Sequence, residues 1–123
     1  MTTTPDPRPQ VVRSEDGTFH LIGSRCRSCG HPMLALPPRC ASCLEPHVAD
    51  ATFGASGTVW SSTVVRIAVP GRTPPYALAY VDIDEGPRVL AHVIGHDERV
   101  AVGQRVRLVS SSAAGDLTVQ VLS

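Results

Sequence analysis

The chain has 123 residues, enough for one ordinary domain or for a small module joined to a slightly larger one. Eleven basic residues, all of them arginine, balance eleven acidic residues, so the formal net charge is zero. A dedicated nucleic-acid binder is usually strongly basic, because phosphate neutralisation supplies most of its affinity. The charge therefore argues against that class, and the short length indicates a modest core that a metal cross-link would stabilise.

The beginning of the chain, MTTTPDPRPQ, lacks the basic start and the apolar run of a secretory signal peptide. No segment approaches the roughly 18–20 apolar residues that are needed to span a bilayer. We therefore predict a cytoplasmic protein whose cysteines lie in a reducing compartment. Residues 1–16 are rich in proline, threonine and charge, and we predict that they form a flexible tail.

The most specific signal is the spacing of the four cysteines. After a short predicted strand at residues 17–25, the chain reads C-x2-C-x10-C-x2-C, with the thiols at Cys26, Cys29, Cys40 and Cys43. Two intervening residues let a tight knuckle direct both of its sulfurs to one point, and a second knuckle completes a tetrahedron. The sequence therefore predicts a rubredoxin-like zinc ribbon over residues 17–50 that holds one structural Zn2+.

Other interpretations of the cysteines are weaker. Free thiols or disulfides do not account for two closely spaced pairs, and an iron redox site is disfavoured by the few aromatic residues. His31 and His47 are close enough in sequence to be spare ligands, although four cysteines already complete a site. Four thiolate ligands leave no open position at which the metal could activate a water molecule, so a catalytic metal is not expected.

Residues 51–123 are predicted to form a second, β-rich domain. Short runs of β-branched and alternating residues predict five strands, at 58–68, 76–83, 88–94, 105–110 and 117–122, after a polar connector at 44–56. The segment from His96 to Gly103 is predicted to hold one short helical turn. Five strands of this kind, the first one long, favour a five-stranded OB-fold barrel, with an open β-sandwich as the alternative. The predicted fold class is therefore mainly β.

No cluster outside the cysteines forms a convincing catalytic set. His92 alternates with apolar neighbours, as a structural or interface histidine does, and the adjacent side chains of His96 and Asp97 point apart. There is no P-loop and no dinucleotide-binding glycine pattern. We therefore predict that the isolated chain is not an enzyme.

A succession of motifs gives the chain a family resemblance. The strings LIGSRCRSCG, LPPRCASC, SGTVWSSTVV, PPYALAYVDIDEGPRVLAHVIG and VGQRVRL resemble the bacterial and archaeal zinc-ribbon OB-fold proteins known as domain of unknown function thirty-five. The resemblance covers residues 20 to about 122. It departs from the family in a short N-terminal stretch without a helical hairpin, and in Leu44, where a glycine commonly follows the last cysteine.

The resemblance implies an accessory subunit of a thiolase-fold enzyme, such as a sterol-carrier-protein-type thiolase, an acyltransferase or a related aldolase. The partner would carry the catalytic residues and handle the acyl-CoA, in lipid or steroid side-chain metabolism among other settings. By motif match, the four cysteines inherit the zinc, and Gly57 the turn into the first barrel strand. Candidates for facing the partner or the acyl-CoA are Tyr76, Pro75, Trp60, Arg66 and Arg72.

The sequence is compatible with two alternatives. Trp60 is either an interface residue or the main core aromatic of a small barrel. A nucleic-acid-binding ribbon–OB module is the alternative function, because both halves occur in such proteins. The zero net charge and the scarcity of strand aromatics for base stacking argue against it.

Overall fold

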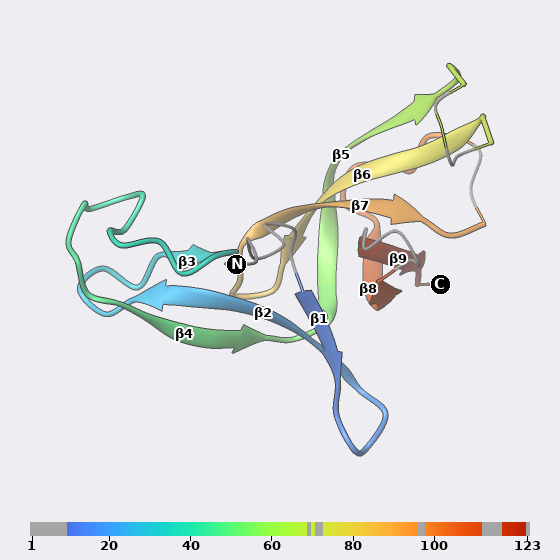
Figure 1. Ribbon diagram of the computed structural model, residues 1–123. Helices are drawn as coiled ribbons and strands as arrows, with labels where there is room; N and C mark the ends of the chain where they lie inside the picture. Colours follow the sequence, from blue (N-terminus) through green and yellow to red (C-terminus); the bar gives the residue numbers. More distant parts are fainter. Residues whose placement is uncertain (1–9, 69, 71–72, 96–97, 112–116, 123) are drawn as a thin grey trace, which may run out of the picture.

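The computed structural model describes residues 10–68, 70, 73–95, 98–111 and 117–122. These residues form nine β-strands arranged in a four-stranded sheet and a closed barrel (Figure 1). The strands are β1 (Gln10–Arg13), β2 (Phe19–Cys26), β3 (Pro32–Met33), β4 (Val48–Phe53), β5 (Ser56–Val65), β6 (Tyr76–Ile83), β7 (Arg88–Val93), β8 (Arg105–Ser111) and β9 (Leu117–Val121). The described part of the chain has no helix that could cross a membrane.

The four-stranded sheet belongs to the cysteine-bearing half of the chain. Its central strand, β2, pairs antiparallel with β1, β3 and β4. The prediction of a flexible tail over residues 1–16 is wrong for Gln10–Arg13, which pair with Phe19–Ile22; residues 1–9 lie outside the described residues. The prediction of a polar connector at residues 44–56 is also wrong for Val48–Phe53, since this segment forms β4 and pairs with β2 along six residues. β4 therefore crosses the predicted border between residues 50 and 51.

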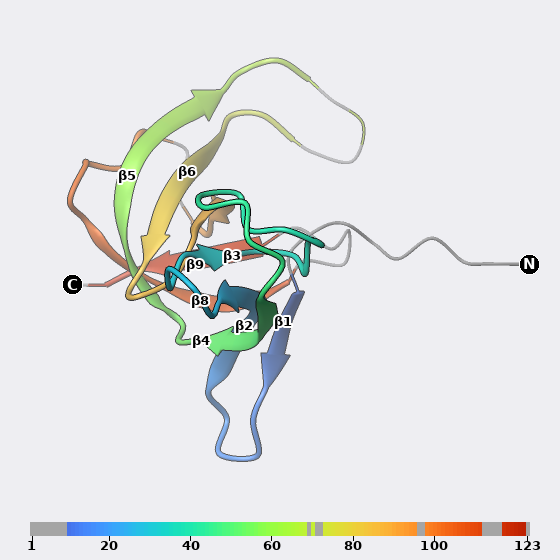
Figure 2. The same cartoon turned by 90° about the vertical axis from the view of Figure 1, so that its left-hand side faces the viewer.

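The second half of the chain is the five-stranded barrel that the sequence predicts, in the order β5-β6-β7-β9-β8. All neighbours are antiparallel except β7 and β9, which pair in parallel through His92–Val93 and Thr118–Val119. Figure 2 shows β5 and β6 curving side by side and continuing past the shorter strands. The closed barrel excludes the open sandwich and confirms the mainly β, OB-fold prediction.

The helical turn expected at His96–Gly103 is not formed by its described residues, 98–103. His96 and Asp97 lie outside the described part of the chain. Instead, Gly103 adopts a φ of 91° and donates its N–H to the Val59 carbonyl at 2.8 Å, while the N–H of Gln104 bonds the Ala101 carbonyl at 3.2 Å. A segment tied to β5 in this way has its backbone groups satisfied without a helix.

Alternation along the barrel strands places one side of each strand in the core. In β6 the residues Ala77, Ala79, Val81 and Ile83 are buried, and β7 and β8 continue the pattern. Gly57 lies within β5 and not in a turn, contrary to expectation. A Cβ atom there would lie 2.7 Å from the carbonyl oxygen of Asp82, so only glycine lets β5 and β6 approach this closely.

The sheet and the barrel share one hydrophobic core. Leu21 from β2 and Phe53 from β4 are buried in the same cluster as the inward-facing barrel residues. Arg25 adds a polar connection, since its guanidinium donates to the carbonyl of Gly30 at 2.7 Å and to the carbonyl of Glu85, in the β6–β7 turn, at 2.6 Å. The two parts are therefore held together by buried apolar contact as well as by hydrogen bonds.

Candidate functional site

Two similar turns position the four cysteines. In the first turn the N–H of Gly30 bonds the Cys26 carbonyl at 2.9 Å, and in the second the N–H of Leu44 bonds the Cys40 carbonyl at 3.0 Å. Gly30 has a φ of 82°, as its position after Cys29 predicts, and Leu44 has a φ of 67°. The second turn therefore places a leucine in the left-handed region that glycine occupies in the first turn.

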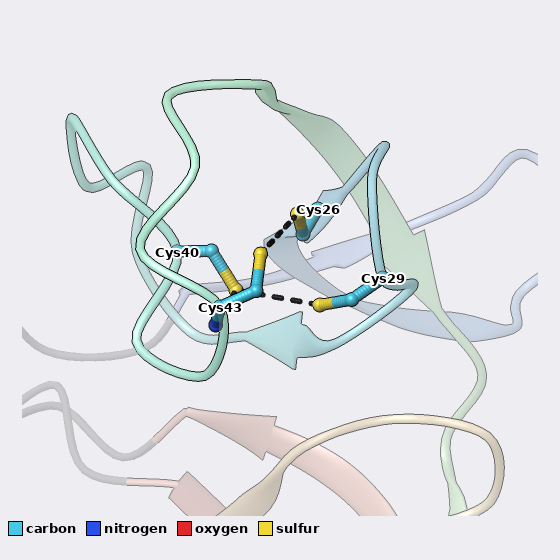
Figure 3. Close-up of side chains that lie close together, drawn as sticks. All are labelled: Cys26, Cys29, Cys40 and Cys43. Atoms are coloured by element: carbon cyan, nitrogen blue, oxygen red, sulfur yellow. Dashed lines mark hydrogen bonds between the residues drawn. The ribbon is translucent and has the colours of Figure 1, made fainter.

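The four sulfur atoms converge between these turns (Figure 3). The Sγ atoms of Cys26 and Cys43 are 3.6 Å apart, as are those of Cys29 and Cys40, and all four lie within 4.8 Å of one another. Zinc–sulfur bonds of about 2.3 Å in a tetrahedron require sulfur atoms about 3.8 Å apart. The observed separations match this arrangement, so the cluster can hold a metal ion of the size and preference of zinc.

Backbone N–H groups stabilise the thiolate form of the first cysteine in each pair, Cys26 and Cys40. The N–H groups of Ser28 and Ser42 donate to the sulfurs of Cys26 and Cys40, each at 3.3 Å. Hydrogen bonding from the backbone of Cys29, followed by that of Ser28, lowers the pKa of Cys26 to about 6 despite burial. The backbone of Cys43 likewise lowers the pKa of Cys40.

The other two thiols are affected in the opposite direction. The backbone N–H of Glu45 lowers the pKa of Cys43, but burial and the three neighbouring sulfurs outweigh it and raise the pKa to about 12. The N–H of His31 and the sulfur of Cys43 lower the pKa of Cys29, but burial and the sulfurs of Cys40 and Cys26 outweigh them and raise it. Four thiolates at this spacing repel one another, and a cation at their centre would allow all four to ionise.

The cluster is closed to catalysis once it holds a metal, because four sulfur ligands complete a tetrahedron. His31 and His47 lie on exposed loops, and the metal-ligating group that the described residues form contains the four cysteines alone. The backbone carbonyl of His47 has another role, as it accepts the N–H of Arg27 at 2.7 Å. The structure thus brings together the four cysteines that the sequence predicts as metal ligands.

Trp60 lies on the outer surface of the barrel, with 51% of its area exposed. The interpretation of Trp60 as the core aromatic is therefore wrong. The guanidinium carbon of Arg88 lies 3.7 Å from the centroid of its indole, and the ring of Tyr80 meets it edge-on with a centroid distance of 6.2 Å. One face of the only tryptophan in the sequence is thus covered by an arginine.

The remaining surface candidates lie apart from Trp60 along the strands. Tyr76 begins β6, is half-buried, and has its ring centroid 5.6 Å from that of His92. Pro75 precedes it and is exposed, and Arg66 is exposed directly after β5. Arg72 lies outside the described residues. Their assignment to a partner or to acyl-CoA stays a prediction.

Sequence reasoning did not single out the residues around Trp60. Tyr80 and Leu90 are directly opposed on β6 and β7 and are about half exposed, and Arg88 is two residues before Leu90. The alternation in YALAYVDI and RVLAHVI could have identified them. If Ala79 and Val81 point into the core, Tyr80 between them must point outward. A cleft of about 470 Å³ between the cysteine-bearing half and the barrel borders this region, through Pro32, Met33, Pro87 and Arg88.

Comparison with known proteins supports the resemblance. A family model described as the ChsH2 C-terminal OB-fold domain matches residues 52–110. A DUF35 domain-containing scaffold protein of Pyrococcus furiosus is 33% identical over 95 residues, which cover 75% of this chain and 69% of that protein. The benzoylsuccinyl-CoA thiolase subunit BbsA of Geobacter metallireducens is 29% identical over 97 residues, 79% of this chain and 66% of that subunit.

A shorter match has higher identity. The alpha subunit of the 3-oxo-4,17-pregnadiene-20-carboxyl-CoA hydratase of Mycobacterium tuberculosis is 47% identical over 53 residues, which are 42% of this chain and 17% of that subunit. Among solved structures, the Ltp2-ChsH2(DUF35) aldolase contains a chain of the same fold, with a TM-score of 0.65, 23% identity, and coverage of 83% of this chain and 84% of that one. With the four-cysteine ribbon, the closed barrel and the Pyrococcus match taken together, this chain belongs to the DUF35 family.

Proposed function

We propose that this chain is a non-catalytic accessory subunit that binds a thiolase-fold enzyme acting on acyl-CoA thioesters. The observation that carries the proposal is the match to a thiolase subunit, BbsA, along 79% of this chain. At 97 residues the match is longer than either part, so it includes both the cysteine-bearing half and the barrel and not a common module alone. The Ltp2-ChsH2(DUF35) aldolase, which contains a chain of the same fold, supports an enzyme subunit as the partner.

In this proposal the metal is zinc, with one ion per chain, and its role is structural. Cys26, Cys29, Cys40 and Cys43 would hold it, and the ion would supply a cross-link between the two turns. Since β2 leads directly into Cys26 and also pairs with β4, a fixed pair of turns orients the sheet that contacts the barrel. The ribbon then serves as a scaffold for the barrel surface.

The partner in this proposal carries the catalytic residues, and the barrel helps to shape the passage of the acyl-CoA. Tyr76, Pro75, Trp60, Arg66 and Arg72 remain the candidates for that surface. Lipid or steroid side-chain substrates are supported by the ChsH2 family model and by the Mycobacterium relative, whose described substrate is a steroid-derived CoA thioester. Thiolysis, acyl transfer and aldol cleavage are all reactions that such a partner could run.

The test is co-expression of this chain with each thiolase-fold subunit encoded by its source genome, followed by size-exclusion chromatography and native mass spectrometry. We expect one such subunit to elute with this chain and to turn over acyl-CoA only, or much faster, in the complex. Turnover by this chain alone that a point substitution abolishes would contradict the non-catalytic role. A control with single-stranded oligonucleotides addresses the nucleic-acid alternative, and submicromolar binding to them without any enzyme partner would favour it.

A further inference from the structure

Three large side chains gather on one outer face of the barrel. Trp60, Tyr80 and Leu90 are 51%, 45% and 49% exposed, and they come from β5, β6 and β7, which lie side by side (Figure 1). Tyr80 and Leu90 are direct cross-strand partners, and the rings of Trp60 and Tyr80 are in edge-to-face contact at an interplanar angle of 79°. Contiguous apolar surface of this kind marks interaction sites more often than isolated exposed residues do.

This outer-face cluster (Trp60, Tyr80 and Leu90) is held in place before any partner arrives. Arg88 lies over the indole of Trp60 and is itself fixed by Asp82, through Nε–Oδ1 and Nη2–Oδ2 contacts of 2.6 and 3.2 Å. An aromatic side chain that is already immobilised loses little conformational entropy on binding. Tryptophan, tyrosine and arginine are also the residues most enriched at interface hot spots.

The cluster also has no net charge to offer a ligand. The positive charge of Arg88 is paired with Asp82 at its own surface, so the face presents apolar rings beside a neutralised ion pair. A strongly anionic ligand, such as a nucleic-acid backbone, gains little from such a face. Complementarity therefore favours an uncharged, apolar segment of a protein.

A shallow pocket next to the cluster indicates what that segment carries. Its volume is about 230 Å³, and its lining is mostly apolar with a hydroxyl-bearing rim, formed by Ser61, Ser62, Thr63, Leu78, Tyr80 and Leu90. Space of this size accepts one large side chain, such as leucine, methionine or phenylalanine. The hydroxyl of Ser62 already donates to the Val100 carbonyl at 2.6 Å, whereas Thr63 is exposed on the rim, where it can meet partner backbone.

We infer that the outer-face cluster and this pocket form the docking site for the thiolase-fold subunit, which inserts one large apolar side chain from an uncharged segment between Leu90 and the rim of Ser61–Thr63. The inference rests on the proposed function and assigns its partner contact to β5, β6 and β7. It places the central contact on the outer wall of the barrel and not at the Pro75–Tyr76 loop.

The experiment uses the full chain and the thiolase-fold subunit that co-purifies with it. Leu90→Asp puts a charge at the pocket, and Thr63→Arg fills the pocket from its exposed rim. Val12→Asp is the matched control, because Val12 is also a strand aliphatic residue and is 47% exposed, on β1. Melting temperature and zinc content show whether each variant is folded. We expect calorimetry to give at least about ten-fold weaker binding for both pocket variants and less than about two-fold change for the control.

Each alternative result has a distinct meaning. If the wild-type chain binds no thiolase-fold subunit, the proposed function and this inference both fail. If the wild type binds but Leu90→Asp and Thr63→Arg bind equally well, the docking site is wrong while the function stands. If sedimentation shows a wild-type dimer that Leu90→Asp dissociates, a second copy occupies this face and the assignment is overturned. If oligonucleotides bind the wild type and lose affinity in Leu90→Asp, the face is a nucleic-acid site instead.

Discussion

At the scale of single residues, the two cysteine turns differ at one informative position. Gly30 and Leu44 follow the last cysteine of each turn, and both have a positive φ, of 82° and 67°. A left-handed conformation costs a residue with a Cβ atom about 1–2 kcal/mol, and Leu44 recovers little of it by burial because it is 67% exposed. The second turn therefore contains strain that the first turn avoids.

Replacing this leucine should stabilise the protein. We expect Leu44→Gly to raise the free energy of unfolding by about 0.5–1 kcal/mol, since relief of strain exceeds the larger entropy that glycine gives the unfolded chain. Urea denaturation of zinc-loaded protein measures the effect. Gly30→Ala is the opposite control and should destabilise the protein by a similar amount. A loss of stability in Leu44→Gly would mean that contacts of the leucine outweigh its backbone strain.

The surface position of Trp60 determines how much stability its side chain contributes. Because the indole is about half exposed and contacts Arg88 and Tyr80 on the surface, Trp60→Ala should lower the free energy of unfolding by only about 1–2 kcal/mol. Removal of a buried tryptophan would cost about 3–5 kcal/mol. Thermal denaturation distinguishes the two values, and Val59→Ala, at a buried neighbour, supplies the comparison for a core position.

At the scale of elements, the sequence predicts the barrel strands well because each contains enough alternating or β-branched residues to be recognised. Tyr76–Ile83 is predicted with its observed ends, and the other barrel strands differ by up to three residues. The missed strands, β1, β3 and β4, are short or polar, and each is a strand mainly because β2 pairs with it. The residue pattern within one of these segments cannot show such pairing, since the partner strand β2 supplies the interactions that stabilise the segment as a strand.

The cysteine spacing, in contrast, predicts the whole ligand set. Each C-x2-C pair predicts one turn from local geometry, and two such pairs predict one four-sulfur cluster, which the structure shows. The surface residues could not be chosen in the same way. Whether Trp60 faces the core or the solvent depends on the β-bulge between Val59 and Ser61, which changes the register of β5 against β6.

The thiol pKa values predict how zinc binding depends on pH. In the metal-free protein the raised pKa values of Cys29 and Cys43 keep both groups protonated near neutral pH, so zinc must displace at least two protons. Affinity should therefore fall at least about hundred-fold for each unit of decrease in pH. Below about pH 6 the fall should steepen, because Cys26, with a pKa of about 6, then also takes up a proton. Competition with a chromophoric chelator across this range measures the slope, and a slope near zero would show that all four thiols are already ionised.

At the scale of the whole molecule, the shared core makes the ribbon and the barrel one cooperative unit. Leu21 and Phe53 come from the ribbon sheet but pack among the barrel residues. If the cluster holds zinc, as we propose, a chelator that removes the ion should therefore lower the melting temperature of the entire chain, in one transition, by about 10 °C or more. Cys40→Ser should act like the chelator. Two separate transitions, with the barrel transition unchanged, would show that the halves unfold independently.

The shared core also limits how this protein could be recombined with its relatives. A fragment cut at the borders of the matched OB-fold model, residues 52–110, would keep Phe53 but would lose Leu21, together with Leu117 and Val119 from the closing strand β9. The fragment would open the barrel at β7 and β8 and expose the site where Leu21 packs. A transplant of the ribbon onto another family member would therefore succeed only if the residues that meet Leu21 and Phe53 were transferred with it. The border between the cysteine-bearing sheet and the barrel is thus crossed by a single core.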